Sequence, residues 1–87
     1  MKLDDLAKRG MMKILYALAE KGEAMNFSEF KNLVGSPTTT SNCLRSLVQT
    51  GFLDKKIQDD RYRSVKYSLT EKGTQVAELV RELERAL

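Results

Sequence analysis

Hydroxyl and amide side chains gather in one stretch of this sequence, SPTTTSNCLRSLVQTGFL, residues 36–53. It opens with five serines and threonines in six residues and continues with Asn42 and Arg45. Ser and Thr are poor residues for a helix interior, because their hydroxyls compete for backbone hydrogen bonds. The same groups can donate to and accept from base edges and phosphate oxygens. The stretch therefore offers hydrogen-bonding chemistry that helix propensity does not explain.

The charge distribution favours the same part of the chain. No carboxylate occurs between Glu29 and Asp54. Of the net charge of +3, residues 36–67 carry +3, whereas residues 1–35 carry +1 and residues 68–87 carry −1. A surface built from the middle of the chain would therefore repel a polyanion less than any other part.

Two helices are predicted before this stretch. Apolar residues from Met11 to Leu18 at helical spacing predict the first, which Gly22 ends. Leu3 and Leu6 extend it upstream, and Gly10 is expected to weaken or kink it. Residues 24–27 predict a small edge strand. The second helix is expected to start at a Ser28 cap and to end at Gly35.

The polar stretch itself predicts a third helix, with Ser36 as N-cap, Pro37 in the first position and Gly51 as its end. Two short helices joined by a tight turn make a helix-turn-helix candidate. The expected buried side is Thr40, Leu44, Leu47 and Val48. The expected outward side is Thr38, Thr39, Ser41, Asn42, Arg45, Ser46 and Gln49. There, Asn42 suits a bidentate contact to adenine, and Arg45 suits either such a contact to guanine or a contact to a phosphate. Each bidentate contact between a side chain and a base contributes roughly 1–3 kcal/mol of discrimination.

After Gly51 the period changes from 3.6 to 2. Residues 52–57 and 65–69 predict two strands around a charged hairpin tip, and Thr70 caps a last helix. The expected apolar side of this last helix is Val76, Leu79, Val80, Leu83 and Leu87. The predicted class is α+β and mostly α: a three-helix core, a two- to three-stranded wing and a C-terminal helix. This is the element order of a winged helix-turn-helix.

Four short motifs resemble the winged-helix transcriptional regulators of the MarR and HxlR types. They are Phe27-Ser28-Glu29-Phe30, residues 41–52, Asp60-Arg61, and Leu69-Thr70-Glu71-Lys72-Gly73. The resemblance as a whole covers roughly residues 11–75. The resemblance implies sequence-specific binding of double-stranded DNA, with the third helix in the major groove. It also implies a wing arginine in the minor groove, best matched by Arg61 with Asp60 as its orienting carboxylate and Arg63 as a rival. Lys55, Lys56 and Lys66 are expected to reach phosphates.

One small domain offers few contacts to an operator, so a homodimer is expected. The MarR type builds its dimer and ligand pocket with extra helices, whereas here one helix follows the wing. The expected dimer contacts are apolar residues of the first and last helices, Leu3, Leu6, Val76, Val80, Leu83 and Leu87. The alternative is that the last helix only covers its own core.

Other classes of function fare less well. The chain has no His and one Cys, with no glycine-rich phosphate loop, so no enzyme, metal site or cofactor is expected. Cys43 is expected to be a small buried residue, with a redox-sensing thiol as the alternative. The rival function is a winged helix used for protein contact without DNA readout.

Composition bounds the remaining expectations. At 41 % hydrophobic and 31 % charged residues, the 87-residue chain predicts one globular domain over residues 1–87. No apolar run is long enough to span a bilayer, and a single cysteine excludes an intrachain disulfide. A cytoplasmic protein is expected.

Overall fold

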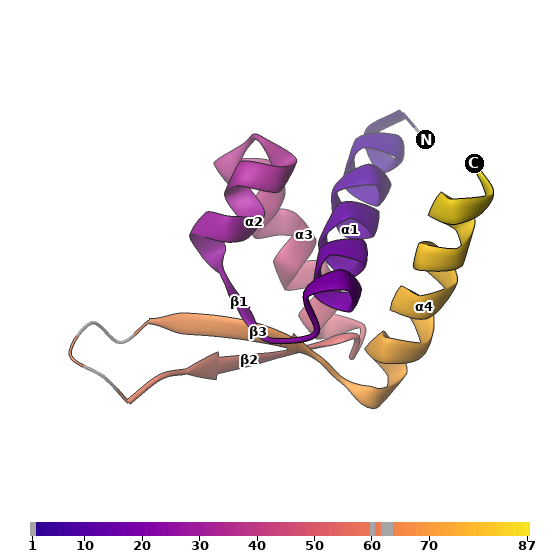
Figure 1. Ribbon diagram of the computed structural model, residues 1–87. Helices are drawn as coiled ribbons and strands as arrows, with labels where there is room; N and C mark the ends of the chain where they lie inside the picture. Colours follow the sequence, from indigo (N-terminus) through magenta and orange to yellow (C-terminus); the bar gives the residue numbers. More distant parts are fainter. Residues whose placement is uncertain (1, 60, 62–63) are drawn as a thin grey trace.

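The computed structural model describes residues 2–59, 61 and 64–87. Four helices and a three-stranded antiparallel sheet follow one another as predicted (Figure 1). Along the chain these elements are α1 (Lys2–Lys21), β1 (Met25–Asn26), α2 (Phe27–Val34), α3 (Pro37–Gln49), β2 (Leu53–Ile57), β3 (Val65–Leu69) and α4 (Glu71–Ala86). The sheet order is β1-β3-β2, so the short β1 is an edge strand. The predicted winged helix-turn-helix class is confirmed.

The core lies where the three N-terminal helices meet the sheet and α4. Burying these apolar side chains is the main favourable contribution to the fold. The helices and the sheet all contribute: among the most buried residues are Ile14, Leu18, Met25, Phe30, Leu44, Leu47, Leu53 and Ala77. The helix-turn-helix pair α2 and α3 is thereby fixed against α1 and the sheet.

The start of α3 forms as the sequence predicts. The Ser36 hydroxyl accepts a hydrogen bond from the backbone N–H of Thr39 at 3.3 Å, and Pro37 opens the helix. Thr40 is fully buried, and its hydroxyl donates to the Ser36 carbonyl oxygen at 2.6 Å. A buried hydroxyl without a partner would destabilise the fold, so this bond explains how a threonine is accommodated in the core.

The predicted cap of α2 is wrong. The cap is Asn26 and not Ser28, which lies inside the helix and is exposed. The Asn26 side chain accepts from the Glu29 backbone N–H at 3.0 Å, and the Glu29 carboxylate accepts from the Asn26 N–H at 3.0 Å. This reciprocal pair satisfies two backbone donors at once, which a serine at position 28 could not do.

Gly10 does not break α1, which is continuous through it. A Cβ added at this position would lie 2.7 Å from the sulfur of Cys43 on α3. The glycine therefore allows α1 and α3 to approach closely, and it does not interrupt the helix.

The start of α4 is held by Thr70 and Gly73. The Thr70 hydroxyl accepts from the Gly73 N–H at 2.9 Å and donates to the Gly51 carbonyl at 2.6 Å. A Cβ on Gly73 would overlap the Phe52 carbonyl oxygen at 1.8 Å. Only glycine fits here, which gives a physical reason for the last residue of the Leu-Thr-x-x-Gly motif.

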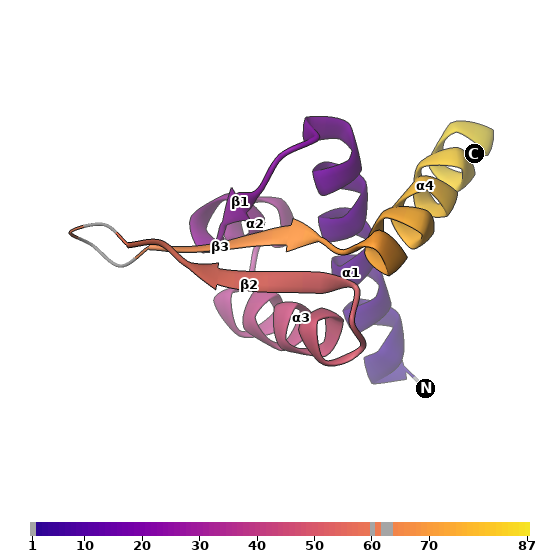
Figure 2. The ribbon, with the colours of Figure 1, turned by 90° about the horizontal axis from the view of Figure 1, so that it is seen from below.

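The buried face of α4 differs from the expected one. It consists of Gly73, Ala77 and Val80, whereas Leu79, which helical spacing places inward, is 65 % exposed. The buried residues at the start of α4 are small, and Gly73 lies directly against the Phe52 carbonyl. Figure 2 shows the C-terminal half of α4 slanting away from α1. The prediction for Leu79 is wrong because helical spacing alone does not give the angle at which two helices cross.

Candidate nucleic-acid interface

The outward side of α3 carries the polar residues that the sequence assigns to it. Thr38, Ser41, Asn42, Arg45 and Gln49 are exposed, and Thr39 and Ser46 are half-buried. The opposite side is closed by Thr40, Leu44 and Leu47, with Val48 half-buried. The predicted division of α3 into an inner and an outer side is therefore confirmed.

Asn42 and Arg45 lie one turn apart on this side. An Arg45 Nη1 N–H donates to the Asn42 side-chain oxygen at 3.5 Å. This contact is long, but it keeps the guanidinium and the amide next to each other on the exposed surface. Neither group has a carboxylate neighbour on α3, because α3 contains no acidic residue.

The wing is defined as β2, β3 and the connection between them, and its two strands extend away from α1 and α4 (Figure 1). The Gln58 N–H donates to the Ser64 carbonyl at 2.7 Å, which extends the strand pairing toward the tip. Arg61 lies in the tip and is exposed. Asp60 and Arg63 lie outside the described residues, so the pairing of Arg61 with Asp60 stays a prediction.

The two faces of the wing carry different lysines. Lys55 lies opposite Tyr67 in the strand register, and Lys56 lies opposite Lys66. Tyr67 packs edge-on against Phe30 of α2, with ring centroids 5.9 Å apart, so its face of the sheet is turned toward the helices. Because side chains alternate along a strand, Lys55 shares this face, whereas Lys56 and Lys66 share the other.

α3 and β2 run side by side, as Figure 2 shows from below. Between them lies a hollow of about 220 Å³, which we call the α3–β2 notch. It is lined by Ser41, Leu44, Arg45, Val48 and Gln49 of α3 and by Lys55 and Tyr67 of the sheet. Two cationic and several neutral polar side chains line it, and no carboxylate of the described part of the chain does. Burial raises the pKa of the Tyr67 hydroxyl, so this group stays protonated near neutral pH.

Tyr67 is the residue of the notch that sequence reasoning misses. In the sequence it is only an apolar position of an alternating strand. The alternation of side chains along the strands is visible in the sequence. Together with the strand register, which pairs Lys55 with Tyr67, it places these two residues on one face.

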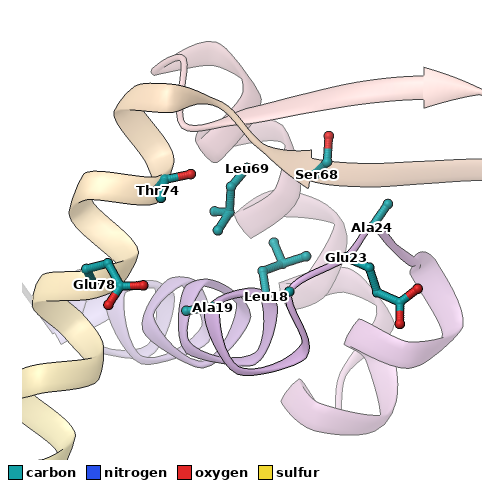
Figure 3. A pocket seen from close by; sticks show the side chains of 9 residues that line it. Leu18, Ala19, Glu23, Ala24, Ser68, Leu69, Thr74 and Glu78 are labelled. Carbon is teal, nitrogen blue, oxygen red and sulfur yellow. The ribbon is translucent and has the colours of Figure 1, made fainter.

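A second hollow has the opposite charge. It measures about 340 Å³ and lies between the end of α1, β3 and the start of α4. Leu18 and Leu69 meet on its floor, and Glu23 and Glu78 stand on either side (Figure 3). Its charged lining is acidic, so it is unsuited to a polyanion.

Part of the stripe expected to contact a partner protomer is exposed. Leu83 is 47 % and Leu87 is 92 % exposed, and Val76 is half-buried. Val80 is 9 % exposed and packs in the protomer's own core. Leu3 and Leu6 lie in α1, but their side chains are outside the described part of the chain.

Cys43 is buried between α3 and α1, with 1 % of its surface exposed. Burial raises the pKa of its thiol, so the reactive thiolate is disfavoured at neutral pH. The geometry fits the prediction of a small buried residue.

Two further properties concern the residues that the structure describes. None of their helices combines the length and apolarity needed to cross a bilayer. No group of three or more His, Cys, Asp or Glu side chains gathers among them as a metal site would require.

Comparison with known proteins leads to the same fold and class. The family model described as HxlR-like helix-turn-helix matches residues 6–86. The chain belongs to the HxlR-like helix-turn-helix family. This confirms the resemblance found in the motifs, and this family is one of transcriptional regulators rather than an enzyme class. No curated protein matches the sequence.

Solved structures of regulators share the fold. YtfH from Salmonella typhimurium, named as a transcriptional regulator, is 32 % identical over 85 % of this chain, with a TM-score of 0.73. ZitR from Lactococcus lactis, at 22 % identity and a TM-score of 0.80, covers 99 % of this chain. A MarR family regulator from Neisseria meningitidis, also at 22 % identity, covers 88 % with a TM-score of 0.75. The matched regions are 66 %, 64 % and 54 % of those three chains, so this chain spans about half to two thirds of their length.

Proposed function

We propose that this HxlR-like protein binds double-stranded DNA as a transcriptional regulator, with α3 in the major groove and the wing in the adjacent minor groove. One observation carries the proposal: the exposed side of α3 is polar and free of carboxylates, and it lies beside a wing that carries Lys55, Lys56 and Arg61. A polyanion with two grooves fits such a surface.

On α3, the short hydroxyl side chains let the helix backbone approach the groove floor. Asn42 is the residue best suited to read a base, since its amide pairs with adenine in a bidentate manner. Thr38, Thr39, Ser41, Ser46 and Gln49 supply hydrogen bonds to bases or phosphates. The positive end of the α3 dipole favours a phosphate near the Ser36 cap.

On the wing, Arg61 enters the minor groove, where a narrow groove concentrates negative potential. Asp60 orients the guanidinium, and Arg63 is the alternative minor-groove residue. Lys55, Lys56 and Lys66 add phosphate contacts from the two faces of the strands. These assignments follow from the family resemblance and from the exposure of the described side chains.

The regulator acts as a homodimer through its outer helices. Val76, Val80, Leu83 and Leu87 of α4 meet Leu3 and Leu6 across a two-fold axis, although Val80 has little surface left for a partner. Two copies of α3 then read half-sites about 34 Å apart, one turn of DNA. The exposed leucines of α4 support this arrangement.

A gel shift with random-sequence duplex over a salt series tests the function. If about five cations of each protomer meet phosphates, log K falls against log salt with a slope of about −4 to −5 per half-site. Absent or salt-insensitive binding would refute DNA binding and favour a module for protein contact. In vitro selection of bound duplexes then returns the sequence and symmetry of the preferred site.

A further inference from the structure

We infer that the α3–β2 notch holds a backbone phosphate of the duplex, gripped jointly by Arg45 and Lys55. The inference rests on the proposed function and assigns one ligand, a phosphodiester oxygen, to one place on the surface. It also gives Arg45 a single role, the phosphate contact, in place of the base contact that its residue type equally allows.

The geometry of the duplex leads to this place. One sugar–phosphate strand separates a major groove from the neighbouring minor groove. A protein that reads both grooves with two adjacent elements must lay the junction of those elements across that strand. Here the elements are α3 and the wing, and their junction is the notch.

The lining of the notch has the chemistry that a phosphate requires. Arg45 presents a planar fork of donors from α3, and Lys55 presents an ammonium from β2. Ser41 and Gln49 add neutral polar groups at four-residue intervals on either side of Arg45, so the three form a row along α3. Among the residues that the structure describes, no carboxylate lines the notch, so none of these lining groups repels an anion.

Strand geometry separates Lys55 from its neighbour. Lys55 and Lys56 are adjacent in β2, are both exposed and carry the same charge, but they stand on opposite faces of the wing. Lys55 lines the notch together with Tyr67, whereas Lys56 pairs across the strands with Lys66. Lys56 is therefore a matched control for coupling to Arg45, because it carries the same charge at the same distance along the wing but does not line the notch.

The test is a double-mutant cycle on the full chain. Binding of a fluorescent random-sequence duplex of about two helical turns is measured by anisotropy at low salt for Arg45→Met, Lys55→Met and Lys56→Met, and for the doubles 45/55 and 45/56. Arg45→Met and Lys55→Met are each expected to weaken binding roughly three- to tenfold, since each removes a charge-assisted contact to a phosphate. All three residues are exposed, and circular dichroism checks that the variants fold.

The coupling between sites decides the outcome. If Arg45 and Lys55 share one phosphate, the 45/55 double loses clearly less than the product of the two single losses, because the second substitution has little left to remove. The affinity of the 45/56 double variant falls by the full product of the losses of its two single variants. The inference would be overturned if the affinity loss of the 45/55 double variant equalled the product of its two single losses. It would also be overturned if both double variants fell short of their products by the same factor.

A second readout separates a phosphate contact from a base contact. On the duplex recovered by in vitro selection, Arg45→Met should weaken binding by the same factor as on random duplex, leaving the preferred sequence unchanged. A loss confined to the selected duplex would assign Arg45 to a base and overturn the inference. If the wild-type chain binds neither duplex, it is the proposed function that fails.

Discussion

α3 and α4 begin in the same way and present opposite surfaces. Each starts with a hydroxyl cap that accepts from a backbone N–H three residues on, Ser36 from Thr39 and Thr70 from Gly73. Beyond the caps they differ: α3 has Arg45 as its sole charged residue, whereas α4 exposes four glutamates and the leucines Leu79 and Leu83.

The difference separates what starts a helix from what selects its partner. The caps satisfy backbone donors, and this does not depend on which residues form the exposed side of the helix. The α3 surface suits a polyanion, and the cationic notch lies beside it. The α4 surface exposes four glutamates against Lys72 and Arg85, so it suits DNA less well than the α3 surface does. It offers apolar side chains to another protein surface, and the acidic hollow lies at its start. We therefore assign DNA to one end of the molecule and the second protomer to the other.

The largest expected effect is at Gly73, which holds α4 against the turn before β2. Gly73→Ala places a Cβ 1.8 Å from the Phe52 carbonyl oxygen, an overlap that no rotamer change relieves. We expect about 3 kcal/mol or more of lost stability, measured by urea unfolding, because the clash is with backbone. Gln75→Ala, at an exposed α4 position, is the control and should change stability by less than about 0.5 kcal/mol. Equal stability of both variants would contradict this role of Gly73.

The assignment of α4 to a second protomer is tested at its exposed leucines. The double variant Leu79→Gln/Leu83→Gln removes apolar surface while keeping good helix formers and adding no charge. It should sediment as a monomer and bind a palindromic duplex about a hundredfold more weakly, since the two half-sites are no longer linked. Leu33 on α2 is likewise an exposed leucine, with 43 % of its surface accessible, so Leu33→Gln is the matched control for loss of exposed apolar surface outside α4. A double variant that remains dimeric would remove α4 from the interface.

The assignment of the wing to DNA is tested at Arg61. Arg61→Ala should weaken binding about tenfold at low salt, because an arginine in a narrow minor groove sits in concentrated negative potential. Arg85→Ala removes the same charge from the exposed side of α4 and should leave affinity nearly unchanged. Equal losses of affinity in the two variants would mean that only net charge matters and that the wing does not enter the minor groove.

The smallest expected effect concerns the shared caps. Ser36→Ala should cost about 1 kcal/mol of stability, the typical value for a lost hydroxyl cap. Thr70→Ala should cost more, because the Thr70 hydroxyl also donates to the Gly51 carbonyl, which would be left without that bond. Thermal unfolding of both variants gives the order. If Ser36→Ala were the more damaging, the second bond of Thr70 would contribute nothing.

The elements are well predicted from the sequence because their signals are local. Gly22, Gly35 and Gly51 all adopt positive φ angles where the helices are expected to end. A period of 3.6 locates the buried side of α3, and a period of 2 locates the strand β3, whereas β2 buries only Leu53 and leaves Ile57 exposed.

The errors arise wherever a residue's role depends on a distant partner. Gly10 looks like a weak point because nothing nearby in the sequence shows that Cys43 packs against it. Leu79 looks buried because periodicity does not give the angle between α4 and α1. The cap of α2 is a different case: Asn26 and Glu29 are both visible in the sequence at the required spacing, and residue type alone favours Ser28 wrongly.

The candidate interface is partly predictable for the same reason. The outward side of α3 follows from one helix and needs no tertiary information. The notch does not, because it joins Arg45 to Lys55 and Tyr67 across the strand register, which the sequence leaves open.

The most direct test of the division between α3 and α4 is a titration of the labelled protein with duplex DNA, followed by amide chemical shifts. Shifts should concentrate in residues 37–49 of α3 and in β2 and β3, and the exposed side of α4 should stay unchanged apart from effects of dimer formation. Shifts concentrated in α4, with α3 unaffected, would contradict the account.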